Sequence, residues 1–171
     1  MITVQPEREE DYTAIHEINA LAFGQENEAR LVENLRKRTD FIPELSLVAV
    51  KDRRVLGHIL FSPIVIQTDK GIFPALALSP MAVHPEFQNQ GIGSELLRQG
   101  SELCRNQGHK IIVVIGHPTY YPRFGFTSAK VRGLDAPFSV PDEAFMVLEL
   151  APGALYDISG MVIYAPEFEE V

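Results

Sequence analysis

Gln88, Gly91 and Gly93 form a Gln-x-x-Gly-x-Gly turn that joins an apolar segment to a helix-forming segment. Because glycine lacks a Cβ atom, the main chain of such a turn can approach a ligand closely. The free N–H groups and the positive dipole end of the following helix attract an anion. These residues therefore predict a phosphate-binding turn.

The spacing of this turn separates it from two other phosphate-binding motifs. A Walker loop requires a lysine directly after its last glycine, whereas Ser94 and Glu95 follow Gly93 here. A dinucleotide-binding fingerprint requires a third glycine three residues further on, where Leu96 stands. The sequence therefore disfavours a nucleoside triphosphatase and a Rossmann-type dinucleotide site.

The turn and the segments after it resemble the GNAT superfamily of N-acetyltransferases. In that family a Gln/Arg-x-x-Gly-x-Gly/Ala turn between the fourth strand and a long helix binds the pyrophosphate of acetyl-CoA. Residues 111–116 resemble the fifth strand, and residues 120–126 resemble the short helix and the Gly-Phe start of a sixth strand. Residues 120–126, together with the apolar tail around residues 149–155, are similar to a group of bacterial predicted acetyltransferases typified by YhbS.

The resemblance implies which residues hold acetyl-CoA. The main chain at Ala82 and Val83 would pair with the pantetheine arm and donate an N–H to the thioester carbonyl, and Pro85 would end that pairing. Tyr121 matches the family tyrosine that protonates the leaving thiolate, and a phenol with an ordinary pKa of about 10 is protonated at neutral pH. The implied cofactor-binding set is Met81, Ala82, Val83, Gln88, Asn89, Gln90, Gly91, Ile92, Gly93, Ser94, Gly116, Tyr121 and Phe124.

Acetyl transfer to an amine also requires removal of a proton from the amine. His117, just after the fifth strand, has the most suitable side-chain pKa and is the second catalytic candidate beside Tyr121. Glu26 and Glu28 lie between the first two helices, in a segment that often lines the acceptor site in the resembling family. The alternatives are a surface position for His117 and a solvated helix start for the two glutamates.

Several other polar residues are expected to play structural roles. Cys104 is the only cysteine, which excludes an internal disulfide and a multi-cysteine metal site, and its apolar helical surroundings predict burial. No His or carboxylate pair has metal-ligand spacing, so no metal is expected. No Cys–His or Ser–His pairing stands out, which is consistent with transfer without a covalent enzyme intermediate. His84 is expected to fix the geometry of the turn. The basic residues 36–38 are expected to form a solvated helix end. Arg98 is expected to be solvated or to contact the 3′-phosphate of CoA.

The composition limits the classes of function. The chain has 171 residues, 46% of them hydrophobic, which is enough for a sizeable core. No apolar run approaches the ~20 residues of a membrane span, and the N-terminus lacks a secretion signal, so a cytoplasmic location without membrane contact is expected. The net charge of −8 disfavours general nucleic-acid binding.

Hydrophobic patterning predicts one α+β domain over residues 1–171. Its core is a mostly antiparallel mixed sheet of six to seven strands, with the fourth and fifth strands parallel and about four helices around it. The expected strands include residues 2–4, 45–50, 55–61, 73–83, 111–116, 144–150 and 160–164, and the longest helix is expected over residues 93–107. An exposed late strand would permit a homodimer.

The sequence and the resemblance together indicate an acyltransferase that moves acetyl from acetyl-CoA to a primary amine of a small-molecule or protein acceptor. The amine would attack directly within a ternary complex. Two alternatives remain open. Transfer of a longer acyl group would depend on the size of the pocket beyond Tyr121, and a non-catalytic CoA-binding sensor or interaction module would bind CoA without releasing thiol.

Overall fold

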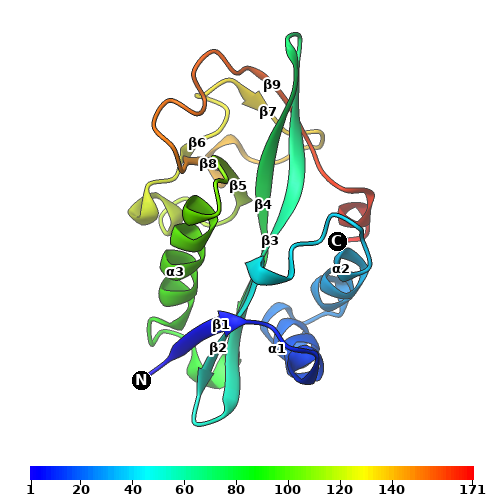
Figure 1. The fold of residues 1–171 in the computed structure, drawn as a ribbon, viewed down its shortest axis with the longest axis vertical. Helices are drawn as coiled ribbons and strands as arrows, with labels where there is room; N and C mark the ends of the chain where they lie inside the picture. Colours follow the sequence, from blue (N-terminus) through cyan, green and yellow to red (C-terminus); the bar gives the residue numbers. More distant parts are fainter. The chain divides into compact units, whose positions relative to one another are not determined.

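The computed structural model describes all residues from 1 to 171, and these form two compact units. The first unit comprises residues 1–62, 79–103 and 166–171, and the second comprises residues 63–78 and 104–165. Strands β3 (Arg54–Thr68) and β4 (Gly71–Val83) and helix α3 (Ile92–Asn106) contribute residues to both units (Figure 1). The single domain expected from the sequence stays a prediction.

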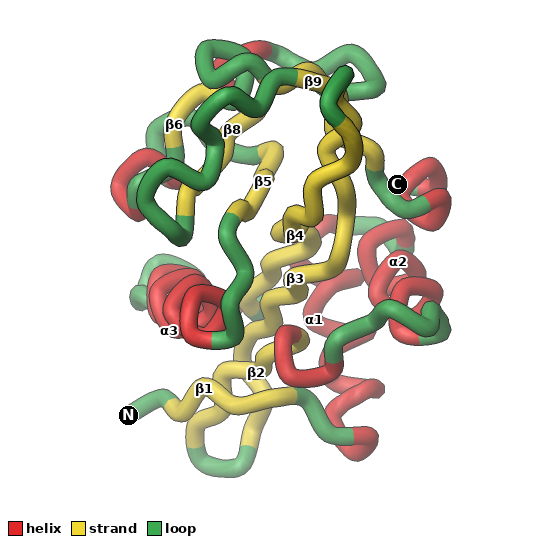
Figure 2. The backbone as a smooth tube through the Cα atoms, turned by 45° about the horizontal axis from the view of Figure 1, so that its top comes forward, coloured by secondary structure: helices red, strands yellow, loops and turns green.

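In the first unit, helices cover both faces of a small sheet (Figure 2). β1 (Thr3–Pro6) pairs antiparallel with β2 (Ser46–Lys51), which pairs antiparallel with the first half of β3. α1 (Tyr12–Phe23) and α2 (Asn27–Arg36) lie against each other on one side, and α3 lies on the other. The turn between β2 and β3 lies at Asp52 and Arg53, as the sequence predicts, and both residues have positive φ angles.

Alternation along β3 explains how its two faces meet different helices. A Cβ atom on Gly57 would lie 3.0 Å from the Leu96 side chain of α3, whereas the next residue, His58, reaches Asn19 of α1. On α3 itself, a Cβ atom on Gly100 would lie 2.6 Å from the Phe61 ring. The glycines at positions 57 and 100 therefore allow close packing of α3, and the predicted apolar stripe on that helix is confirmed.

The second unit contains the other half of the β3–β4 hairpin and five further strands: β5 (Ile111–Ile115), β6 (Thr127–Ser128), β7 (Leu134–Asp135), β8 (Phe145–Glu149) and β9 (Gly160–Ile163). Their order is β7-β9-β3-β4-β5-β8-β6. β4 pairs parallel with β5, and β7 pairs parallel with β9, whereas β9 with β3, β5 with β8, and β8 with β6 are antiparallel. The predicted parallel pairing of the fourth and fifth strands is confirmed.

The predicted α+β class with a mixed sheet is confirmed, and the element counts are refined. There are nine strands because β6 and β7 have two residues each, too few to create an alternating sequence pattern. Three α-helices are present, and the remaining helical turns are 3-10 helices at Glu9–Asp11, Pro43–Leu45, Pro85–Phe87, Tyr121–Phe124, Asp142–Ala144 and Pro166–Glu170. None of the helices has the length and apolar character needed to cross a lipid bilayer.

The basic residues at the end of α2 are not uniformly solvated, which corrects the sequence-based expectation. Arg36 donates two hydrogen bonds of 2.9 Å to the carboxylate of Glu7, whose side chain is only 2% exposed. Arg38, in contrast, pairs with Asp40 and Glu167 at the surface. The expectation failed for Arg36 because its partner precedes it by 29 residues and is brought close by the fold.

Candidate functional site

The turn between β4 and α3 has the backbone conformation of an anion-binding loop. Asn89 and Gly91 have positive φ angles of 63° and 87°, so the chain uses the left-handed region twice before the helix begins. The Glu95 N–H donates to the Gly91 carbonyl at 3.0 Å, which forms the first helical hydrogen bond. The N–H groups of the first turn of α3 therefore lack intrahelical acceptors. Their role in binding phosphate stays a prediction.

Two polar side chains fix the start of this turn. The Gln88 amide donates a 3.1 Å hydrogen bond to the carbonyl of Val83, the last residue of β4. His84 accepts a 3.1 Å hydrogen bond at Nδ1 from the Glu86 N–H, so its expected service to the turn's geometry is confirmed. The first motif residue, Gln88, thus stabilises the loop by folding back onto the strand.

The last residues of β4 present an unpaired strand edge in the first unit. The N–H of His84 donates a 2.8 Å hydrogen bond to a carbonyl of β3. Because N–H groups alternate in direction along a strand, the N–H of Ala82 also points to β3, whereas those of Met81 and Val83 point away from it. β4 pairs with β5 only at residues 76–77. The N–H groups of Met81 and Val83 are therefore free to bind an extended ligand.

In the second unit, Tyr121 begins the 3-10 helix Tyr121–Phe124 and is only 7% exposed. Its ring packs edge-on against Phe126, with 5.5 Å between ring centroids, and against Tyr120, at 5.1 Å. Burial, together with the nearby Tyr120, raises the pKa of the Tyr121 phenol to about 12. The hydroxyl is therefore protonated at neutral pH, which is the state that a proton donor requires.

The neighbours of Tyr121 have structural explanations beside their predicted roles. A Cβ atom on Gly116 would lie 2.4 Å from the Tyr121 ring, so this glycine makes room for that ring. Phe124 is half-buried and packs against Tyr120, with 5.2 Å between ring centroids. His117 is exposed, and its carbonyl accepts a 3.1 Å hydrogen bond from the Tyr120 N–H. Its role as the base stays a prediction.

The predicted cofactor-binding residues divide between the two units. Residues 81–83 and 88–94 belong to the first unit, whereas Gly116, Tyr121 and Phe124 belong to the second. Each group is continuous within its own unit, around the end of β4 in one and after the end of β5 in the other.

A histidine of α1, His16, lies between two carboxylates, one just before α2 and one within it. His16 contacts Glu33 at 2.8 Å through Nδ1 and Glu26 at 3.0 Å through Nε2. The hydrogen bond to Glu33 is the main cause that raises the pKa of His16, and Glu26 adds to it. Glu28 is 9% exposed and accepts hydrogen bonds from Gln25. The expected solvated helix start is therefore wrong for Glu28, whose carboxylate is buried.

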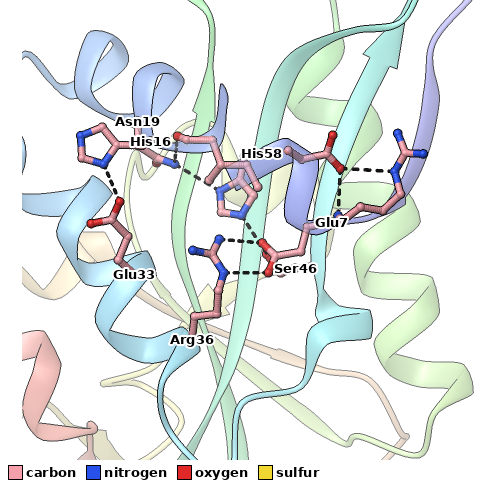
Figure 3. A network of polar contacts seen from close by, with 10 residues as sticks. Glu7, His16, Asn19, Glu33, Arg36, Ser46 and His58 are labelled. Atoms are coloured by element: carbon pink, nitrogen blue, oxygen red, sulfur yellow. Dashed lines mark hydrogen bonds and ion pairs between the residues drawn. The ribbon is translucent and has the colours of Figure 1, made fainter. Parts of the chain in front are cut away.

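A buried polar network that the sequence did not reveal lies in the first unit (Figure 3). Asn19 contacts His58 Nδ1 at 3.3 Å, His58 Nε2 contacts the Ser46 hydroxyl at 3.0 Å, and that hydroxyl donates to Glu7 at 2.6 Å. Since Ser46 gives its proton to Glu7, His58 must donate from Nε2 and accept the amide proton of Asn19 at Nδ1. Arg36 completes the network by donating two hydrogen bonds to the Glu7 carboxylate.

The fold brings together a Ser–His pair that does not stand out in the sequence. Ser46 and His58 are both 0% exposed, and burial lowers the pKa of His58 to about 3. The ring is therefore neutral and the hydroxyl is sealed from substrate, which fits a structural role. In the sequence, Ser46 and His58 each stand as a single polar residue in an apolar strand. Their contact could not be predicted, because it depends on how β2 is aligned against β3.

The remaining polar candidates have structural surroundings. Cys104 is fully buried, and burial raises the pKa of its thiol to about 12, which confirms the predicted packing role. Arg98 is exposed and pairs with Glu95 one turn earlier on α3. No group of three or more His, Cys, Asp or Glu side chains is arranged to hold a metal ion.

Comparisons with known proteins agree on one family. A family model described as an acetyltransferase (GNAT) domain matches residues 3–129. YjhQ of Escherichia coli K12, an uncharacterized N-acetyltransferase, is 39% identical over 134 residues, which cover 78% of this chain and 74% of YjhQ. YhbS of the same strain, also an uncharacterized N-acetyltransferase, is 32% identical over 148 residues, which cover 86% of each chain.

Solved structures give the same result. The Escherichia coli YhbS structure in complex with CoA matches with a TM-score of 0.91 and 29% identity, and it covers 98% of this chain and 92% of its own. A GNAT family acetyltransferase from Brucella melitensis in complex with acetyl-CoA matches with a TM-score of 0.80 and 30% identity over 98% of both chains. This chain therefore belongs to the GNAT family of acetyltransferases.

Proposed function

We propose that this protein transfers the acetyl group of acetyl-CoA to a primary amine of a small molecule or a protein, by direct attack in a ternary complex. The observation that carries the proposal is the left-handed turn at Asn89 and Gly91, which leads into α3 directly after the unpaired edge of β4. The two similar structures from Escherichia coli and Brucella melitensis contain CoA and acetyl-CoA, which supports this choice of co-substrate.

The first unit supplies the groups that hold the co-substrate. The pyrophosphate would bind to the N–H groups of residues 91–93, where the dipole of α3 and donors without intrahelical acceptors favour an anion. Met81 and Val83 would donate their edge N–H groups to the pantetheine arm and the acyl oxygen. A donor fixed on a strand can stabilise the negative charge that develops on that oxygen during attack. Gln88 acts indirectly, because its side chain bonds to Val83.

Acetyl-CoA supplies an activated acyl group and a thiolate that can leave. Tyr121 would donate a proton to that thiolate, since its buried phenol is protonated at neutral pH. His117 would accept the proton of the amine, either directly or through water. Glu26 lies on the α1–α2 segment that we propose to border the acceptor, where its carboxylate would favour a cationic amine.

The side chains of this protein favour direct attack over an acyl-enzyme intermediate. The single thiol, on Cys104, is buried and has a raised pKa, so it is a poor nucleophile. The hydroxyl of Ser46, although bonded to a histidine, is sealed inside the first unit and donates its proton to a carboxylate. Neither group can accept an acyl group in the folded protein, which supports direct attack of the amine on the thioester.

We also propose, in line with the sequence, that residues 1–171 act as one N-acetyltransferase domain in the cytoplasm. A homodimer formed through the late strands is part of the same proposal. Size-exclusion chromatography with light scattering measures the oligomeric state directly, and a monomeric mass across the concentrations used for turnover would reject the dimer.

Thiol release from acetyl-CoA with a panel of amines tests the proposed reaction. Replacement of Tyr121 by Phe should lower kcat about a hundredfold and leave the affinity for acetyl-CoA within about twofold, since it removes only the proton donor. Tyr164→Phe is the matched control, because Tyr164 also has a raised phenol pKa and lies in the same unit. Unchanged turnover in Tyr121→Phe would remove Tyr121 as the acid.

The same assay separates the alternatives. Acetyl-CoA binding without thiol release from any amine would identify a sensor or interaction module rather than an enzyme. Faster release from a longer acyl-CoA than from acetyl-CoA would identify a different acyl donor.

A further inference from the structure

The second unit contains a cavity of about 560 Å³ at the beginning of β5. Its walls come from residues 73–75 of β4, residues 108–111 and the loop 151–158 after β8. Tyr121 lies beyond the other end of β5, and the five-residue strand separates the two places by ~13 Å or more. A volume of this size suits a small organic ligand, so the cavity is a candidate site apart from the predicted catalytic tyrosine.

The floor of the cavity is apolar. It is lined by Phe73, Ala75, Ile111 and Ile158. The residues Ala75, Ile111 and Ile158 are each at most 9% exposed. Contact with such a floor removes apolar ligand surface from water, at roughly 25 cal/mol per Å². The floor therefore favours a ligand with an apolar body.

The walls are fixed by hydrogen bonds before any ligand binds. The Leu150 N–H donates to the Lys110 carbonyl at 2.7 Å, and Arg105 donates to the Leu150 carbonyl at 2.9 Å. The loop that follows is fixed where the Leu155 N–H donates to the Glu149 carboxylate at 2.8 Å. Preformed walls reduce the entropy lost on binding.

The charges around the cavity favour an anion. Lys110 is exposed and takes part in none of the ion pairs of the structure, whereas Lys70 is paired with Asp157. His109 also lines the cavity, and burial lowers its pKa, so its ring is neutral at pH 7 and can donate one hydrogen bond. Lys110 is thus an unpaired cation in a chain whose net charge is −8. It would repel an ammonium group, which separates this cavity from a site for the acceptor amine.

We propose that this cavity is a second binding site, for a small molecule with an apolar body and a single carboxylate or phosphate group. The anionic group lies at Lys110, with His109 as a further donor, and the apolar body lies on Phe73 and Ile111. The inference is independent of acetyl transfer, because every residue that it uses lies in the second unit and none is assigned to the reaction.

Titrations of the ¹⁵N-labelled full chain, followed by NMR, test this site with four probes. Phenylacetate and phenyl phosphate combine an aromatic body with an anion, 2-phenylethanol has the body alone, and acetate has the charge alone. We expect one or both of the first two to shift the amide signals of residues 108–111 and 151–158 with saturation. Each of the last two should bind at least tenfold more weakly. The stronger of the two anionic probes identifies the preferred group.

Lys110→Gln removes the charge and leaves an uncharged polar side chain one atom shorter, so it should weaken binding of the better probe about tenfold. Lys130→Gln is the matched control in the same unit, because Lys130 is exposed but pairs with Asp135 away from the cavity. The spectrum of each variant also reports whether it is folded. The proposal fails if no amide of the walls shifts up to about 10 mM probe, if 2-phenylethanol binds equally well, or if Lys110→Gln binds like the parent chain.

Discussion

The turn after β4 and the buried network around His58 both contain residue types that can do chemistry, but they differ in which atoms remain available. In the network, both ring nitrogens of His58 and the hydroxyl of Ser46 are used by protein partners. In the turn, the side chain of Gln88 supports the backbone, whereas the main-chain N–H groups of Met81, Val83 and residues 91–93 have no acceptor within the sheet or helix.

A binding site therefore depends on unpaired atoms more than on residue identity. A Ser–His pair suggests a nucleophile, yet here its burial and its complete set of partners make it a structural connection between Asn19 of α1 and Glu7, which directly follows β1. Residues 88–93 of the turn include no cysteine, histidine, carboxylate or lysine, yet the main-chain donors and the helix end can bind an anion.

Removal of Arg36 should have the largest effect. Arg36→Met leaves the nearly buried Glu7 carboxylate without its cation, which should lower the free energy of unfolding by about 3–5 kcal/mol. Arg38→Met is the control, because Arg38 pairs at the surface and its loss should cost less than about 1 kcal/mol. Urea unfolding of both variants measures the difference. Equal losses would show that the network does not depend on this ion pair.

The second-largest effect should be a loss of stability at low pH that is caused by His58. Its pKa is lowered from 6.5 to about 3 in the folded protein, so the unfolded chain binds a proton first as the pH falls. Stability is therefore lost as the pH falls from 6.5 toward 3, and the loss at pH 5 should be about 2 kcal/mol. His58→Gln lacks this contribution. If urea unfolding gave the variant the same pH profile as the parent chain, a neutral buried His58 would be rejected.

Loss of the Gln88 side chain should have a smaller effect, on binding. Gln88→Ala removes the hydrogen bond to Val83 that supports the turn, which should weaken acetyl-CoA binding about fivefold, or about 1 kcal/mol. Gln99→Ala on the exposed side of α3 removes a hydrogen bond to Glu95 and is the control. Calorimetric titration measures both. A greater loss of affinity in Gln99→Ala would contradict the assigned role of Gln88.

His16 should give the smallest effect, with a sign opposite to that of His58. Its pKa is raised, so its stabilising contribution is full below pH 6.5 and is lost as the pH rises through the folded pKa. Because the side chain is 34% exposed, solvent should limit the contribution to less than about 1 kcal/mol. His16→Gln should therefore destabilise more at pH 6 than at pH 8.5 in thermal unfolding. The reverse order would contradict the assignment.

Much of the fold could be predicted from the sequence because its signals are local. The strands around residues 45–50 and 55–61, the turn between them and the apolar stripe of α3 all follow from patterns within one element. The parallel pairing of β4 and β5 followed from the helical crossover between them. The two-residue strands β6 and β7 were not predictable, since two residues show no period.

The candidate site was only partly accessible in the same way. Gln88 and Gly91 could be found because their spacing encodes one backbone turn, and the structure shows that Gly91 has a positive φ angle. The partners of Arg36 and His58 could not be found, because they lie 29 and 12 or more residues away and meet only through the fold. The cavity at Lys110 was also missed, because its walls come from three separate segments.

Calorimetric titration of acetyl-CoA into the parent chain, Gly91→Val and Gly24→Val tests whether the turn after β4 binds acetyl-CoA. Gly91 and Gly24 have positive φ angles of 87° and 67°, and a Cβ atom at either would meet nothing within 4 Å, so valine strains both backbones without a clash. We expect Gly91→Val to weaken binding at least tenfold and Gly24→Val to bind like the parent chain. Equal binding by all three proteins, or no binding by the parent chain, would contradict the assignment of the turn to acetyl-CoA.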